Sequence, residues 1–212
     1  MARSRLNSPK RPMYTWATKP AANAFPVGVP IWISDVGVGG GSRWYSNGTG
    51  WVPEAGRLLV AAGEPALNHT GDIVDQTGAS GTDRIVYTLP ADILGTHGVA
   101  EVAHFWSYTN SANTKTLRVR FGGTSGTSAQ LPQPTTTATA QLSCFIRNQN
   151  SKSAQIYFAP SSSSTFITST SAVTTSTIDT TLTQDILIGG QLSNTAEFIK
   201  LESYRIWVEP AW

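Results

Sequence analysis

The sequence contains few of the residues that build helices, disulfide frameworks or membrane spans. Its 212 residues include one cysteine, two methionines and three histidines, and only 13% of them are charged. A single cysteine cannot form an intrachain disulfide, so a disulfide framework is excluded. No run approaches the roughly 18 consecutive apolar residues that a transmembrane helix needs. We therefore expect neither a disulfide-rich fold nor insertion into a membrane.

Small polar residues and turn formers are abundant instead. The chain holds 49 serine and threonine residues, 19 glycines and 12 prolines. Threonine favours strands because its branched Cβ fits a pleated surface, whereas serine, glycine and proline favour turns. Seven tryptophans, six tyrosines and seven phenylalanines must also be covered by a core. The composition predicts an all-β protein with one main domain and an appendage.

The N-terminal segment carries most of the positive charge. Residues 1–34 contain five lysines and arginines and no acid, so the overall charge of +2 leaves −3 on the remainder. Repeated prolines disfavour a helix here, and no apolar core of a signal peptide is present. The charge is too dispersed to predict binding to nucleic acid. We predict that residues 1–24 form an extended anchoring arm, attached to a partner by Arg3, Arg5, Lys10, Arg11, Tyr14 and Trp16.

A small β-hairpin unit is predicted next, over residues 25–56. Two aromatic strands flank Asn47-Gly48, a dipeptide typical of tight hairpin turns in which both central residues adopt positive φ. Such a unit is too small to be stable alone and must pack on a neighbour. The glycines at 37 and 39–41 do not form a phosphate-binding loop, because no Lys-Ser/Thr pair follows them at the required spacing. Residues 57–82 are rich in turn formers, which predicts a linker that contains at most a short strand.

From residue 83 to residue 212 the sequence shows a regular series of strand-like segments in which polar and apolar residues alternate. In residues 116–121 the apolar Leu117, Val119 and Phe121 alternate with outward Arg118 and Arg120. In the last strand the apolar parity changes, which predicts a bulge near Glu202 and Ser203. The pattern predicts an antiparallel, jelly-roll-like β-sandwich, with strands over 84–89, 101–109, 115–122, 139–147, 154–159, 164–168, 182–188 and 196–208 and a short helical turn over 90–95.

The sequence lacks an evident catalytic or metal-binding constellation. Cys144 lies in an apolar run and is expected to be a small buried hydrophobe. His104 lies in an apolar strand, where a hydrogen-bonded structural role is expected rather than that of a base. His69, Asp72 and Asp75 form a weak cluster that would still need a further ligand and a rigid frame to bind a metal. We predict no enzymatic activity, no metal and no cofactor.

Two loops contain Asn and Ser in a similar pattern, over residues 110–115 and 148–153. Asparagine tolerates left-handed backbone conformations, so these segments can be ordinary loops of a sandwich. They can also bind a sugar, because amides next to an aromatic face can hold hydroxyl groups. Both interpretations remain open. The candidate receptor contacts are Trp106, Tyr108, Asn110, Asn113, Asn148 and Asn150.

Several stretches resemble structural proteins of tailed bacteriophages. Residues 25–36, followed by Trp44-Tyr45-Ser46-Asn47-Gly48-Thr49-Gly50-Trp51, resemble a strand and aromatic hairpin module of tail fibres and spikes. Residues 104–123 and 146–151 are similar to β-sandwich domains of phage virion proteins, including head fibres and decoration proteins. The resemblance implies a homotrimeric, non-enzymatic protein of the virion that is assembled in the bacterial cytoplasm.

Two functions follow from this resemblance. The first is a short trimeric fibre or fibre tip that is anchored to a portal, tail, collar or capsid protein by its arm. In that role the sandwich would attach to a host-surface glycan through the loops over 110–115, 125–137 and 148–153. The alternative is a capsid or collar decoration protein that stabilises the particle without binding a receptor.

Overall fold

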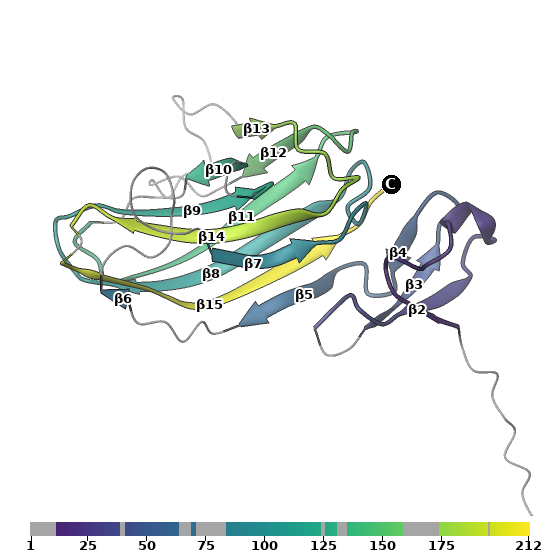
Figure 1. The fold of residues 1–212 in the computed structure, drawn as a ribbon, viewed down its shortest axis with the longest axis horizontal. Helices are drawn as coiled ribbons and strands as arrows, with labels where there is room; N and C mark the ends of the chain where they lie inside the picture. The colour runs from purple at the N-terminus through teal and green to yellow at the C-terminus, as the bar shows by residue number, and fades with distance from the viewer. Residues whose placement is uncertain are drawn as a thin grey trace, which may run out of the picture.

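The protein is all-β. A computed structural model describes residues 12–38, 41–63, 69–70, 84–123, 126–130, 135–158, 174–194 and 196–212. Within these ranges every regular element is a strand except one 3₁₀ turn, η1 (Ala22–Ala24). Figure 1 shows a small sheet near the N-terminal side that lies against one end of a larger sandwich.

The small sheet has the strand order β1-β2-β3-β4, formed by β1 (Met13–Tyr14), β2 (Pro30–Ile33), β3 (Ser42–Ser46) and β4 (Trp51–Pro53). β1 runs parallel to β2, and the other pairs are antiparallel. Trp44 and Trp51 both point to the buried face. The loop after β3 differs from the predicted turn because only Gly48 has a positive φ, of 90°. Asn47 instead accepts hydrogen bonds through Oδ1 from the backbone N–H groups of Thr49 and Gly50.

The predicted antiparallel β-sandwich is confirmed, and it consists of two facing sheets. The larger sheet has the order β13-β12-β11-β8-β15-β5, with β6 also paired to β15; its strands are β5 (Leu58–Gly63), β6 (His69–Thr70), β8 (Val99–Tyr108), β11 (Thr139–Asn148), β12 (Gln155–Phe158), β13 (Thr174–Ser176) and β15 (Phe198–Glu209). The smaller one has the order β10-β9-β14-β7, from β7 (Arg84–Leu89), β9 (Lys115–Phe121), β10 (Thr127–Gln130) and β14 (Gln184–Leu192). The chain crosses repeatedly between the sheets, as in a jelly roll.

The core fills the space between these two sheets. Alternate residues of β8 are buried, as expected for a strand with one face on a core. The Trp106 ring lies against β14 at Gly190, where a Cβ would come within 2.8 Å of Ile199 Cδ1 and 3.0 Å of the indole ring. Glycine is therefore required at position 190 for the two sheets to approach each other around Trp106.

The predicted bulge in the last strand is also confirmed. The register between β15 and β8 shifts between Leu201 and Ser203. Glu202 is the extra residue of this bulge. It lets both Leu201 and Ile206 face the core, although one has an odd and the other an even residue number. Residues 91–95 form turns and bends where a short helical turn is predicted. The predicted strand over 164–168 lies outside the described residues.

Two other predictions need correction. The short strand predicted within the linker is present as β5, but it pairs with β15 at the edge of the larger sheet, so residues 58–63 belong to the sandwich rather than to a linker. Arg118 and Arg120 do lie on the opposite side of β9 from the core residues, but they are 8% and 5% exposed. The alternation in the sequence correctly predicts that these arginines face away from the core. It does not indicate that this outer face of β9 is itself buried.

Aromatic side chains join the small sheet to the end of the sandwich. Trp16 is 5% exposed, packs against Trp44 with ring centroids 5.0 Å apart, and donates its indole N–H to the Ala91 carbonyl at 2.7 Å. A second contact in this joint between the small sheet and the sandwich is made by Trp212, which covers Gly50 so closely that a Cβ at residue 50 would overlap the indole ring. The prediction that the small unit must pack on a neighbour is confirmed, and the neighbour is the same chain.

Candidate functional site

The predicted anchoring residues have different locations. Arg3, Arg5, Lys10 and Arg11 lie outside the described residues. Tyr14 is half-buried in β1, opposite Ile33 of β2. Trp16 cannot attach the chain to a partner, because its ring is already buried in the joint within this chain. An anchoring role can therefore rest only on the first part of the predicted arm.

The two Asn-containing loops lie at opposite ends of the sandwich. The loop over 109–114 follows β8, whereas the loop over 149–154 follows β11, which is antiparallel to β8. Asn110 and Asn150 are exposed in these separate loops, and Asn150 has the left-handed φ of 51° expected for asparagine. The structure thus does not bring the predicted receptor contacts together into one site.

Four of the predicted receptor contacts instead stabilise the fold. Trp106 and Tyr108 are 0% and 1% exposed in the core. Asn113 donates to the Glu197 carboxylate at 2.5 Å and so ties two loops together. Asn148 is 1% exposed, donates to the Gly95 carbonyl and accepts from Gln155. A buried amide with satisfied hydrogen bonds is a structural group and has no surface to offer a ligand.

The titratable candidates of the core are also structural. Cys144 is a free, buried thiol, as predicted, and burial raises its pKa to about 12. His104 is buried, and desolvation lowers its pKa to about 3. Its Nδ1 accepts a 2.6 Å hydrogen bond from the Trp106 indole, but its Nε2 has no partner among the described atoms. The expected structural role is therefore correct, although the ring is only half satisfied.

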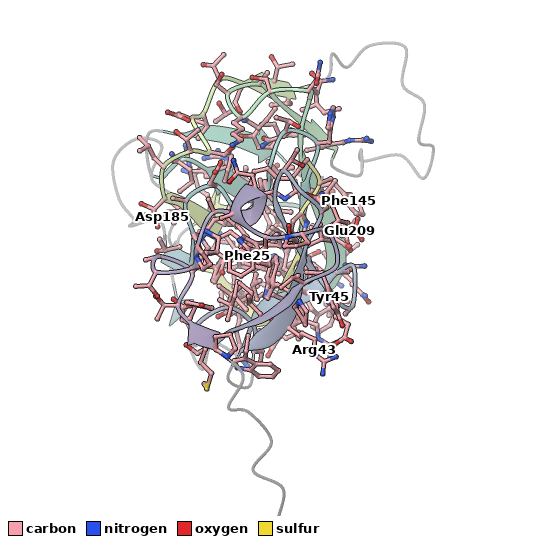
Figure 2. All side chains as sticks on the ribbon, turned by 90° about the vertical axis from the view of Figure 1, so that its right-hand side faces the viewer. Phe25, Arg43, Tyr45, Phe145, Asp185 and Glu209 are labelled. Carbon is pink, nitrogen blue, oxygen red and sulfur yellow. The ribbon has the colours of Figure 1, made fainter. Side chains whose placement is uncertain are left out.

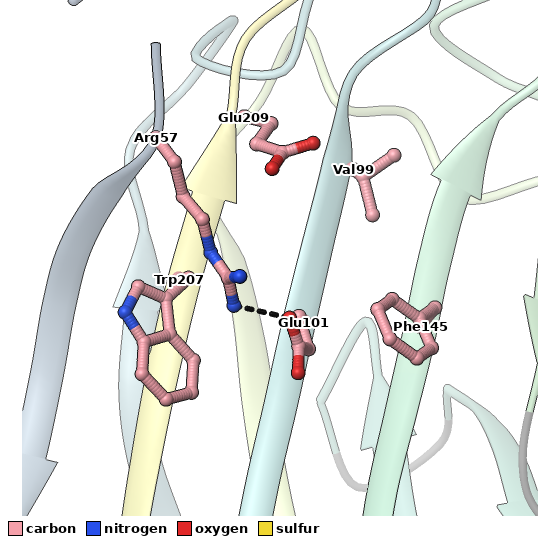
Figure 3. Close-up of a pocket in the computed structure, with 6 residues that line it drawn as sticks. All are labelled: Arg57, Val99, Glu101, Phe145, Trp207 and Glu209. Carbon is pink, nitrogen blue, oxygen red and sulfur yellow. Dashed lines mark hydrogen bonds and ion pairs between the residues drawn. The ribbon is translucent and has the colours of Figure 1, made fainter. Parts of the chain in front are cut away.

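A shallow pocket lies on the outer face of the larger sheet, away from the core (Figure 3). It has a volume of about 140 Å³ and is lined by side chains from four strands or their ends, namely Arg57, Val99, Glu101, Phe145, Trp207 and Glu209. The register explains their convergence, because Trp207 pairs with Glu101, and Glu101 pairs with Phe145. β8 and β15 lie in the middle of this sheet, so the pocket is built on a rigid frame.

The pocket presents an aromatic surface beside oriented polar groups. The Arg57 guanidinium lies 4.4 Å from the centre of the Trp207 ring and forms an ion pair with Glu101. Stacking and the ion pair together fix the planar guanidinium in one orientation. Phe145 is 38% exposed, although large apolar side chains usually avoid water. Aromatic surface with a few fixed polar groups is typical of small-molecule binding sites.

Charges of both signs surround this pocket. Its lining includes one guanidinium and two carboxylates, from Glu101 and Glu209. The exposed Arg147 and Arg205 lie on the same face, since Arg147 pairs with Val99 and Arg205 precedes Trp207 by two residues. In Figure 2 Phe145 and Glu209 lie on one side of the molecule and Asp185 of β14 lies on the other. The face therefore has no dominant charge, which favours a neutral ligand.

Other classes of site find no support in the part of the chain that is described. Those residues contain no group of three or more His, Cys, Asp and Glu side chains placed to hold a metal ion. Asp72 and Asp75 of the weak His69 cluster lie outside the described residues. No helix among the described ranges is long and apolar enough to cross a membrane.

Sequence reasoning missed the pocket because its residues are distant in the chain. Arg57, Glu101, Phe145 and Trp207 are at least 44 positions apart and meet only through the strand order β11-β8-β15-β5. One indication was available in the final strand. There Trp207 alternates in step with the polar Arg205 and Glu209, so it faces the side of the sheet opposite to the core residues Ile206 and Val208. A tryptophan on a polar face indicates an aromatic surface outside the core, and Trp207 is half-buried there.

Comparisons with known proteins give little further information. A scan against protein-family models finds no match, and a search of curated proteins finds none either. Among solved structures, the lectin I from Ulex europaeus in complex with the methyl glycoside of α-L-fucose is similar over 86% of this chain and 98% of that chain. The identity is 11% and the TM-score is 0.34. A likeness of this strength assigns neither a fold nor a ligand to the chain.

Proposed function

We propose that this protein is a non-enzymatic attachment protein that binds a host-surface glycan through the outer face of its larger sheet. The observation that carries the proposal is the aromatic surface of the half-buried Trp207 and the exposed Phe145 beside the Arg57 and Glu101 ion pair. A pyranose ring has an apolar C–H face that packs on aromatic rings and hydroxyl groups at its edge. Carboxylates and guanidinium groups form strong hydrogen bonds with such hydroxyls.

The place of the protein in a bacteriophage virion rests on the sequence resemblance of residues 25–51 and 104–123. In this proposal the protein is a trimeric short fibre or fibre tip. Four of the basic residues of the predicted arm, Arg3, Arg5, Lys10 and Arg11, attach it to a portal, tail, collar or capsid protein. The sandwich then displays its pocket toward the host cell.

Removal of the Trp207 ring tests the glycan-binding role. We expect Trp207→Ala to weaken binding to neutral saccharides by about 10- to 100-fold, because about 1.5–3 kcal/mol of apolar contact is lost. Binding partners are first selected on a glycan array, and affinities are then measured by titration calorimetry. Phe198→Ala is the matched control, because Phe198 is a 44% exposed aromatic residue of the same strand outside the pocket. Equal affinities of the parent and Trp207→Ala would contradict the proposal.

Oligomeric state tests the implied assembly. We expect sedimentation of the full chain to give about three times its mass of 22.6 kDa at micromolar concentration. A stable monomer under these conditions would contradict both the fibre and the decoration protein.

A decoration protein of the capsid or collar is the second candidate. It is favoured by the exposed Phe105 and Phe145 on one sheet face, which a neighbouring subunit could cover. The two functions make different predictions for the virion. Labelling of the capsid lattice together with absence of retention on host cells would support the decoration role and exclude attachment.

A further inference from the structure

A second cluster of similar chemistry lies on the small sheet. Arg43 of β3 donates to Glu54 at 2.8 Å and to the Tyr45 hydroxyl at 3.2 Å, and this hydroxyl donates to Glu54 at 2.9 Å. Trp32 of β2 is directly opposite Arg43 in the register and is half-buried. These residues lie on the face of the small sheet opposite the buried Trp44. Like the pocket, this Tyr45 cluster combines aromatic rings with an arginine and glutamate pair.

The pocket and the Tyr45 cluster lie on the same side of the molecule. Figure 2 shows Arg43 and Tyr45 on the side where Phe145 and Glu209 also lie. The chain itself connects the two sites, since Glu54 of the cluster precedes Arg57 of the pocket by three residues. Three residues span at most about 11 Å. Contacts of the buried Trp16 and the half-buried Trp212 hold the small sheet against the sandwich, so the spacing between the sites is fixed.

The size of the pocket indicates how the two sites are used. At about 140 Å³ it is smaller than the roughly 300–1,000 Å³ of sites that enclose a drug-sized ligand. It can therefore contact about one sugar ring at a time. A ligand that covered both aromatic surfaces would have to be an extended chain.

We propose that the glycan is an extended neutral polysaccharide, one unit of which lies on Trp207 while a following segment lies on Tyr45. This inference rests on the proposed glycan-binding function. A neutral chain is favoured because the arginine of each cluster is already paired with a carboxylate, Arg57 with Glu101 and Arg43 with Glu54. An anionic chain would have to compete with these carboxylates.

Affinity as a function of chain length tests this inference. The probes are linear oligosaccharides of glucose, mannose, galactose and N-acetylglucosamine, each with two and with six units, titrated into the full-length protein. For the sugar that binds, we expect the six-unit chain to bind about tenfold more tightly than the two-unit chain, because it adds a second aromatic contact. Tyr45→Ser should remove this gain and leave the two-unit affinity unchanged.

Two further variants separate the possible results. Tyr45→Phe keeps the ring and should retain most of the gain, whereas Trp207→Ala should weaken both chain lengths. Equal affinities for two and six units, or a gain that survives Tyr45→Ser, would overturn the extended site and leave the proposed function intact. Absence of binding by every oligosaccharide would overturn both. Thermal unfolding of each variant verifies that it is folded.

Discussion

Replacement of Trp106 by alanine should lower the free energy of unfolding by about 3–5 kcal/mol, which is the range for removal of a large aromatic side chain from a core. The ring is 0% exposed and fills the space that Gly190 leaves between the two sheets. The substitution also removes the hydrogen bond from the indole to His104 Nδ1. Urea denaturation followed by tryptophan fluorescence or circular dichroism measures the change.

The neighbouring residue provides the control for this prediction. Phe105 lies on the opposite face of β8 and is 36% exposed. Phe105→Ala removes an aromatic ring from the same strand without opening a cavity, so we expect a loss below about 1 kcal/mol. Similar losses for the two variants would contradict the sheet packing described above.

The stability of the protein should decrease in acid in a way that depends on His104. Trp106 donates to Nδ1, so the single proton of the neutral ring is on Nε2. A second proton on Nδ1 would displace the indole hydrogen bond and place a charge in the core. Burial accordingly lowers the folded-state pKa of His104 from 6.5 to about 3. The stabilisation that comes from keeping His104 neutral is fully present above pH 6.5 and is lost progressively as the pH falls toward 3. It changes little below pH 3.

We expect the free energy of unfolding to fall by about 3 kcal/mol between pH 7 and pH 4. Below the unfolded-state pKa of 6.5, each further pH unit costs about 1.36 kcal/mol until the folded-state pKa is reached. Urea denaturation at a series of pH values measures it as the difference between the parent and His104→Leu, in which contributions of the carboxylates cancel. Cys144→Ala is the control, because the pKa of this thiol is raised to about 12 and the thiol is neutral throughout this range. Identical pH dependence of the parent and His104→Leu would contradict the prediction.

Local patterns in the sequence predicted the strands well. In β9 apolar and polar residues alternate because every second side chain faces the core. In β15 the apolar residues switch from odd to even positions, and both patterns can be read along a single strand. The bulge at Glu202 and Ser203 therefore follows from the pattern of this one strand, without knowledge of its neighbours. The joint at Trp16 could not be identified in the same way, because its partner Ala91 is 75 positions away.

The location of the site depended on strand order, which local patterns do not determine. The sequence places Trp106 and Tyr108 beside a loop rich in asparagine, which predicts them as receptor contacts. Their parity places both in the core with Val102, whereas Glu101 and Phe105 occupy the outer face. Only the pairing of β8 with β15 and β11 shows that Trp207 and Phe145 share this outer face with Glu101.

The central claim is that Trp207 is the surface on which the glycan lies. A ¹H–¹⁵N spectrum of the labelled protein resolves the indole N–H groups of its seven tryptophans, and the Trp207→Ala variant identifies the signal of Trp207. On addition of the neutral oligosaccharide selected by the array, we expect the Trp207 signal to shift, whereas those of the buried Trp44, Trp51 and Trp106 should not. Saturating saccharide that leaves the Trp207 signal unchanged would contradict the account.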